Sequence, residues 1–222
     1  LFPNRPVKSG EPRMKIAFLT PYGPGLGGME VFTERLQRAL TPFGHTFEWF
    51  TFEHSKHQPE FKLGRVLSFL PHREELKARA IARVFNKRAK EFDVVIANDY
   101  FGMYANHPRV IMVTHGYYPD IHASMPKGLS FFKRLWWGQL GTIQKKAMKK
   151  AWKSITVSKR NERVLMQYGC KVDLAIPHGI DTDFFSRVSN PLKKLNVPSL
   201  GTDSFLLFVG SHAPWKNTEM VE

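Results

Sequence analysis

Short apolar runs alternate with helical segments along most of this chain. The runs with the length and composition of strands lie at 15–20, 46–52, 93–97, 109–113, 154–157 and 172–176. Between them, the segments 30–40, 73–90 and 140–153 repeat apolar residues at helical spacing. Strands separated by helices form βαβ units with right-handed crossovers. The sequence therefore predicts an α/β, Rossmann-like parallel sheet with helices on both faces.

The end of the chain indicates a second domain. Residues 186–204 are rich in Ser, Asn, Pro and Lys and are expected to be an interdomain linker. Residues 205–222 begin with a buried strand that runs into a turn, as the start of a further parallel sheet would. We expect an N-terminal Rossmann-like domain at 14–185 and only the first strand of a truncated second domain. Residues 1–13 are expected to be a leader or a remnant of cloning.

The charge is strongly positive and unevenly distributed. The formal net charge is +14, and no acidic residue occurs between Asp120 and Glu162. Nucleic acid, an anionic membrane surface or a phosphate-bearing substrate would each suit such a charge. The single cysteine, Cys170, permits no internal disulfide and fits a reducing compartment. No apolar run approaches the roughly 20 residues that span a bilayer, so we expect a cytoplasmic protein that is either soluble or peripheral on the inner face of the membrane.

The loop after the first predicted strand contains four glycines in the ten residues 21–30. Glycines let the backbone approach a ligand closely, and the N-terminus of the following helix favours a phosphate. The glycines are equally compatible with a tight turn that binds nothing. Their spacing matches neither the dinucleotide-binding motif nor the P-loop, which argues against a nicotinamide enzyme and a P-loop NTPase.

Two polar residues follow the central strands. His115 comes shortly after the strand at 109–113, where it can reach a cleft and exchange protons near neutral pH, or simply be satisfied within its loop. Asp99 follows the preceding strand and can bind sugar hydroxyls or cap a helix. His54 and His57 lack metal-ligand spacing, and we expect them to be exposed to solvent.

Four ordered motifs carry a family resemblance. They are Gly-Gly-Met-Glu at 27–30, His-Gly at 115–116, Ile-Thr-Val-Ser at 155–158 with Tyr-Gly at 168–169, and Ile-Pro-His-Gly-Ile-Asp-Thr-Asp-Phe at 176–184. Together they resemble the N-terminal half of a GT-B fold glycosyltransferase of family 4, a group of retaining nucleotide-sugar enzymes. The last motif is the most specific, since it departs from the family pattern I-P-N-G-[IV]-D-x-x-x-F only at His178.

The resemblance implies transfer of a sugar from a nucleoside-diphosphate sugar to a glycan or lipid-linked acceptor, with retained configuration and no metal or other cofactor. It implies that the Gly27 and Gly28 amides and Lys216 hold the donor diphosphate and that His115 contacts the donor sugar. We expect Asp99 and Tyr117 on the acceptor side.

Two features depart from an active family member. Ser211 stands where the family has an arginine, so a non-catalytic protein that keeps the fold without binding the donor remains an alternative. The family's acidic motif would lie beyond residue 222. We expect this chain alone to be inactive. Asp181 and Asp183 spell D-x-D, which holds a metal in another glycosyltransferase fold, but they lie in the hinge motif and we expect no metal there.

The basic stretch combines lysines with aromatic residues. In 140–153, apolar residues occupy one helical face and five lysines the other, as in a helix that packs on the sheet with its lysines in solvent. The expected membrane or lipid-acceptor contacts lie at its start, at Phe131, Phe132, Lys133, Arg134, Trp136 and Trp137. Nucleic acid is not expected as a partner, because no zinc spacing, RNA-binding signature or helix-turn-helix is present.

Overall fold

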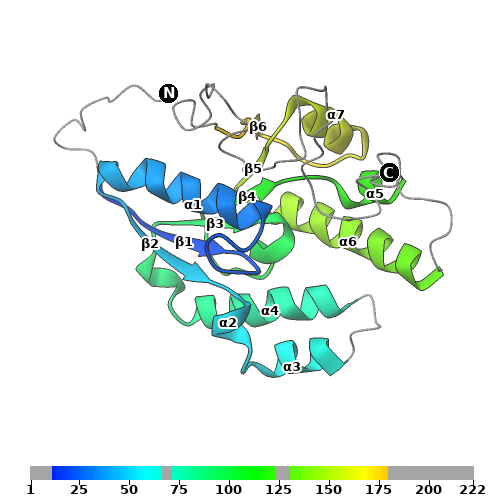
Figure 1. Ribbon diagram of the computed structural model, residues 1–222, viewed down its shortest axis with the longest axis horizontal. Coiled ribbons are helices and arrows are strands. Elements are labelled where there is room, and N and C mark those ends of the chain that lie inside the picture. The colour runs from blue at the N-terminus through cyan, green and yellow to red at the C-terminus, as the bar shows by residue number, and fades with distance from the viewer. Residues whose placement is uncertain (1–11, 67–71, 124–130, 180–222) are drawn as a thin grey trace, which may run out of the picture. The chain divides into compact units, whose positions relative to one another are not determined.

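The computed structural model describes residues 12–66, 72–123 and 131–179 (Figure 1). The strands in these residues are β1 (Lys15–Leu19), β2 (Thr46–Phe50), β3 (Val94–Asn98), β4 (Val110–Thr114), β5 (Lys153–Thr156) and β6 (Leu174–Ala175). The α-helices are α1 (Gly28–Leu40), α2 (Phe52–Ser55), α3 (Pro59–Val66), α4 (Arg73–Asn86), α5 (Tyr118–Ala123), α6 (Phe131–Lys150) and α7 (Lys159–Gln167). Short 3₁₀ helices are η1 (Thr41–Phe43), η2 (Ala89–Glu91) and η3 (Asp99–Gly102).

The contacts between residues divide the chain into two compact units. One is formed by residues 6–178 and contains all of these elements. The other is formed by residues 1–5 and 179–222, of which only Gly179 is described. The predicted linker at 186–204 and the predicted second domain at 205–222 lie outside the described residues.

The described strands form one parallel sheet in the order β2-β1-β3-β4-β5-β6. The chain first adds β2 on one side of β1 and then builds outward on the other side from β3. The strand order therefore reverses between β1 and β3. In open parallel sheets, ligands bind beyond the carboxyl ends of the strands at such a reversal. The predicted α/β parallel sheet is confirmed, and its topology singles out the ends of β1 and β3.

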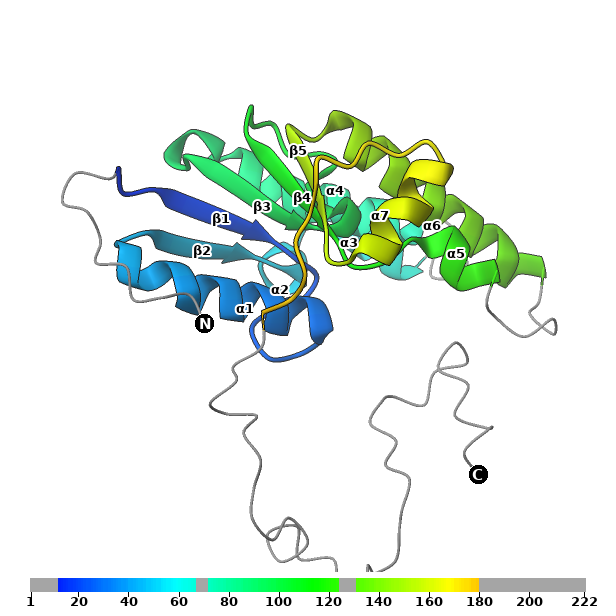
Figure 2. The same ribbon diagram turned by 90° about the horizontal axis from the view of Figure 1, so that it is seen from above.

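Helices cover both faces of the sheet (Figure 2). Ile16 and Phe18 of β1 point toward α1, where Phe32 and Leu36 pack on them. The alternate residues of the same strands join a larger core with α4 and α6 on the opposite face. This alternation is the two-residue period of a strand, and burial on both faces explains why β3 is apolar in nearly every position.

Helix α6 is longer than the sequence pattern predicts. It begins at Phe131 and so includes the aromatic segment, and it ends at Lys150, three residues before the start of β5 at Lys153. Its buried side is continuous through Trp137, Leu140, Ile143, Ala147 and Met148. No helix in the described residues is both long and apolar enough to cross a bilayer.

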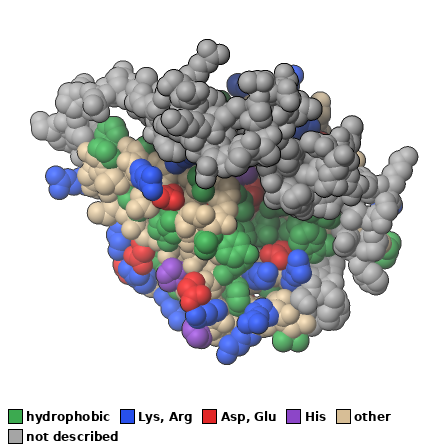
Figure 3. Space-filling model, viewed as in Figure 1, with side chains coloured by type: hydrophobic (Ala, Val, Ile, Leu, Met, Phe, Trp, Pro, Cys, Tyr) green, Lys and Arg blue, Asp and Glu red, His purple; other side chains and the backbone are tan. Residues whose placement is uncertain are grey.

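Charged side chains of both signs are mixed on part of the surface. Lys and Arg are interleaved with Asp and Glu along the lower edge in Figure 3. On α4, Arg79 pairs with Glu75 and Arg83 with Glu60, each at 3.0 Å. Exposed pairs of this kind contribute little to stability, about 0–1 kcal/mol each, so the two-sided core is the main stabilising feature.

Gly102 provides a test of the packing between η3 and the sheet. A Cβ at this position would lie 2.6 Å from the Ala97 Cβ and 3.1 Å from the Val110 Cγ1. We expect Gly102→Ala to lower the free energy of unfolding by about 1–3 kcal/mol through overpacking. Gly138→Ala is the control, since no atom lies within 4 Å of its added Cβ, and in a helix it should stabilise by about 0.5–1 kcal/mol. Urea unfolding followed by circular dichroism measures both, and equal effects would contradict the packing described.

Candidate functional site

Buried polar side chains meet where β1, β3 and β4 end. Thr20, Asn98 and Thr114, at these three ends, are at most 2% exposed. The first turns of α1 add Glu30 and Thr33, each 1% exposed. Burying a polar group is unfavourable unless it forms hydrogen bonds. The Thr114 hydroxyl has no hydrogen-bond partner among the described residues, so the bonds that the other four side chains make define the site.

Asn98 is the centre of this network. Its Nδ2 donates to the hydroxyl oxygens of Thr20 at 3.1 Å and Thr33 at 2.8 Å. Its Oδ1 lies 3.0 Å from Nε2 of His115. Because the amide nitrogen already donates, the oxygen must accept, and His115 must carry a proton on Nε2. The Nδ1 atom of the neutral ring is then left with its lone pair, available as an acceptor.

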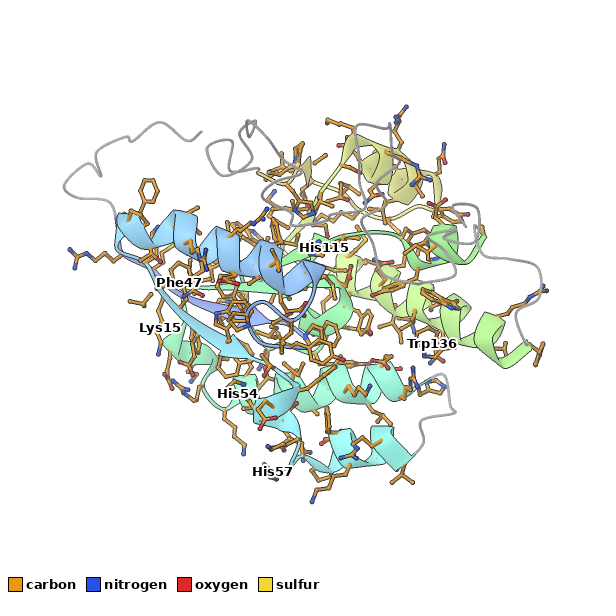
Figure 4. The ribbon with its side chains drawn as sticks, viewed as in Figure 1. Lys15, Phe47, His54, His57, His115 and Trp136 are labelled. Atoms are coloured by element: carbon orange, nitrogen blue, oxygen red, sulfur yellow. The ribbon has the colours of Figure 1, made fainter. Side chains whose placement is uncertain are left out.

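His115 is held as a neutral ring. Burial lowers its pKa from 6.5 to about 4, with a smaller contribution from His178. The His178 ring stacks on it at 5.6 Å, and Phe32 meets it edge-on at 5.2 Å. Asn161 Nδ2 donates to the backbone carbonyl of His115 at 3.1 Å. His115 lies beside the N-terminal end of α1 (Figure 4). Because its pKa is about 4, the ring can donate or accept a hydrogen bond there but is not a cation at neutral pH.

The two glycines of the first loop have different roles. A Cβ on Gly27 would lie 2.5 Å from Oε2 of Glu30, so a side chain there would displace the carboxylate. Glu30 in turn accepts hydrogen bonds from the Thr20 hydroxyl at 3.0 Å and the Tyr22 amide at 3.3 Å. Gly28 is exposed, with no atom within 4 Å of an added Cβ. A ligand can therefore approach the start of α1 at Gly28. The predicted partner cation, Lys216, lies outside the described residues.

Asp99 is buried rather than open to a ligand. Its carboxylate accepts from the Gln144 side chain at 3.2 Å, the Tyr118 hydroxyl at 3.3 Å and the His115 amide at 3.4 Å. Burial raises its pKa from 3.8 to about 7. Asn98, not Asp99, occupies the cap position of η3, so the alternative that Asp99 caps a helix is wrong. Asp99 instead has a φ of 47°, a left-handed backbone conformation that Asp tolerates better than most residues.

Tyr117, the other residue expected at the acceptor, is also buried. It is 6% exposed and its ring packs against that of Tyr168 at 4.7 Å. Burial raises the pKa of its hydroxyl to about 12. In this structure, direct contact of Tyr117 or Asp99 with an acceptor would require these side chains to leave their present partners.

The aromatic segment at the start of α6 faces two ways. Trp137 is 8% exposed and its ring lies 5.7 Å from that of Tyr118, so it is a core residue and not a lipid contact. Trp136 is half-buried under the Arg73 guanidinium at 5.1 Å. Phe131 is 70% exposed and Arg134 is exposed. The side chains of Phe132 and Lys133 lie outside the described residues.

The remaining histidines of interest are remote from this site. His54 and His57 are exposed and lie well away from His115 (Figure 4). His54 has a local role, since its ring bonds to the backbone and side chain of Thr51 in a capping box. The described residues contain no group of three or more His, Cys, Asp or Glu side chains suited to a metal ion. Asp181 and Asp183 lie outside them.

Sequence reasoning did not identify Asn98, Tyr118 and Gln144 as parts of the network. A signal was present for two of them. Asn98 is a polar residue at the end of an otherwise apolar strand, and Gln144 lies among the inward-facing residues of α6, fully buried. Buried polar residues on an apolar face need partners. Which partners they have depends on contacts across 45 residues in the case of Gln144 and Asp99.

The sequence of this domain matches a known protein family. The family model described as Glycosyltransferase Family 4 matches residues 26–184, well over half of the chain. The chain belongs to glycosyltransferase family 4. A search of curated proteins gave no match. In this family 4 domain, the matched segment includes His115 and its partners Asn98, Phe32 and His178.

The raised pKa of Asp99 makes the free energy of unfolding depend on pH. Between about pH 4 and pH 7 the unfolded chain loses the Asp99 proton while the folded protein keeps it, so the Asp99 contribution to stability falls as pH rises. His115 has the opposite effect between about pH 4 and 6.5, because only the unfolded chain binds its proton there. The two slopes therefore oppose each other in wild type.

The Asp99→Asn variant separates them. We expect its free energy of unfolding, minus that of wild type, to increase from pH 4 to pH 7, by at most about 1.4 kcal/mol per pH unit, and to be constant above. Urea unfolding at several pH values measures this difference. A difference that is the same at every pH would show that Asp99 titrates normally.

Proposed function

We propose that this family 4 domain serves a glycosyltransferase that moves a sugar from a nucleoside-diphosphate sugar to a glycan or lipid-linked acceptor, with retained configuration, and that it forms the acceptor side of the enzyme. Family membership supports glycosyl transfer as the class of reaction. The observation that carries the finer proposal is the neutral His115 at the end of β4, with its Nε2 proton directed to Asn98.

Opposite charges develop on the two parts of the donor during glycosyl transfer. As the bond to the diphosphate breaks, the leaving oxygens gain negative charge and the sugar becomes cation-like. The exposed start of α1 at Gly28 suits the leaving group, because free amides and the helix dipole favour an anion there. Lys216 would add a full positive charge, so the proposed reaction uses no divalent metal.

The neutrality of His115 fits the other half of the charge. A protonated imidazole beside a cation-like sugar would raise the energy of the transition state, whereas a neutral ring does not. With Nε2 donating to Asn98, Nδ1 can accept a hydrogen bond from a sugar hydroxyl and so orient the donor. We also propose a cytoplasmic location, which the single, buried Cys170 supports.

Replacing His115 tests its role. His115→Gln keeps an amide that can donate to Asn98, so the fold should persist, but it removes the ring. In the full-length protein we expect turnover to fall about 100-fold or more, because a misplaced donor loses the alignment that transfer needs. His115→Ala should be at least as severe. His57→Gln, at an exposed and remote histidine, is the control. Near wild-type turnover in His115→Gln with unchanged unfolding would contradict the proposal.

A thermal-shift screen of the full-length protein tests the ligand class. We expect a nucleoside diphosphate to raise the melting temperature, since a ligand that binds only the folded state stabilises it. Stabilisation by a polynucleotide instead would indicate a nucleic-acid-binding module. A protein stabilised by neither would fit a non-catalytic scaffold, the alternative that Ser211 leaves open. A panel of nucleotide sugars would then identify the donor.

A further inference from the structure

The outward side of α6 is a distinct surface. The helix packs on the core through Trp137, Leu140, Ile143, Gln144, Ala147 and Met148. The side chains that point outward and are exposed are Phe131, Arg134, Leu135, Thr142, Lys145, Lys146, Lys149 and Lys150. At 3.6 residues per turn, Phe131, Leu135, Lys145 and Lys149 fall within one stripe. We call the exposed residues from Phe131 to Lys150 the α6 outer stripe.

We infer that the α6 outer stripe binds an anionic lipid surface, with its lysines on the headgroups and its exposed apolar side chains in the interfacial layer. This differs from the surface expected from sequence, because Trp137 is in the core and the lysines of the second half of the helix take its place. The inference concerns lipid binding and does not depend on the proposed reaction.

The lysines of the stripe are not neutralised within the described part of the protein. On α4, by contrast, two arginines have carboxylate partners, Arg79 with Glu75 and Arg83 with Glu60. On α6, Lys145 and Lys150 donate to the backbone carbonyls of Tyr168 and Met103. Lys146 and Lys149 have neither an ion pair nor a side-chain hydrogen bond to any described residue. No acidic residue lies between Asp120 and Glu162 to pair with them along the chain.

This arrangement is unfavourable in the isolated domain. Lys145 and Lys149 are four residues apart on a helix, as are Lys146 and Lys150, and Lys146 and Lys149 are three apart. Like charges at these spacings repel. An external anionic surface relieves this repulsion, whereas solvent only screens it.

The apolar part of the stripe favours lipid over nucleic acid. Phe131 is 70% exposed and Leu135, one turn later, is 46% exposed. Trp152, just beyond the other end of the helix, is 49% exposed. The phosphate backbone of a nucleic acid binds cations and gains little from contact with an exposed leucine. A helix that lies in a membrane interface buries apolar side chains beside its cations. The twenty residues of α6 extend about 30 Å, which is long enough to contact many headgroups.

Vesicle co-sedimentation of the whole chain tests the inference. The vesicles contain phosphatidylcholine alone or with one third phosphatidylglycerol. We expect binding only to the second kind, and release at high salt. Each cation near such a surface contributes about 1 kcal/mol, a factor of about five in the partition coefficient, so Lys146→Gln/Lys149→Gln should weaken binding about 25-fold.

Two matched controls make the result specific. Lys62→Gln/Arg65→Gln changes the net charge equally at exposed positions on α3 and should have little effect. Leu135→Gln should weaken binding several-fold, whereas Met166→Gln, at a residue that is 60% exposed on α7, should not. Urea unfolding confirms that each variant keeps its fold.

Several results would overturn the inference. Absence of binding to anionic vesicles would do so, as would equal losses from the α6 and α3 pairs, which would reflect net charge alone. Binding to a polynucleotide but not to vesicles, weakened by the lysine pair and insensitive to Leu135→Gln, would make this a nucleic-acid surface. The assay contains neither donor nor acceptor, so its failure would leave the proposed transfer reaction untouched.

Discussion

The side-chain amide of Asn98 connects four elements of the domain. Through it, β3 is joined to Thr20 after β1, to Thr33 of α1 and to His115 after β4. All of these groups except His115 are almost completely buried, and an unpaired buried polar group costs about 1–3 kcal/mol. The relative positions of the four elements are therefore coupled to a single side chain. The same bonds determine which nitrogen of His115 carries the proton.

Burial near this amide shifts two ionisable groups in opposite directions. It raises the pKa of Asp99 to about 7 and lowers that of His115 to about 4. In both cases the low-dielectric surroundings disfavour the charged form. Between these two pH values, both side chains are mainly neutral. His115 and Asp99 can therefore orient a polar ligand without adding charge of their own, and the positive end of α1 at Gly28 remains the feature that attracts an anion.

Helix α6 links this interior to the outer surface. On its inward side, Gln144 donates to Asp99 at 3.2 Å and to the carbonyl of Gly116 at 2.6 Å, and accepts from the Tyr118 amide at 3.2 Å. On its outward side lie lysines without carboxylate partners among the described residues. One helix thus supports the loop that carries His115 and presents a basic face, so its orientation about its own axis matters for both.

The sequence alone determined the α/β class, the helices on both faces of the sheet and the family, because two-residue and 3.6-residue apolar periods and short ordered motifs are local properties. It also placed His115 and the glycine loop at strand ends. Tertiary structure decided what these residues contact. Only packing shows that Gly27 makes room for Glu30, that Asp99 and Tyr117 are buried, and that Trp137 faces the core while Phe131 faces outward. The physical reason is that such contacts join residues far apart in the chain, like the hydrogen bond between Asn98 and Thr20 across 78 positions. A local sequence pattern does not determine which distant residues come into contact.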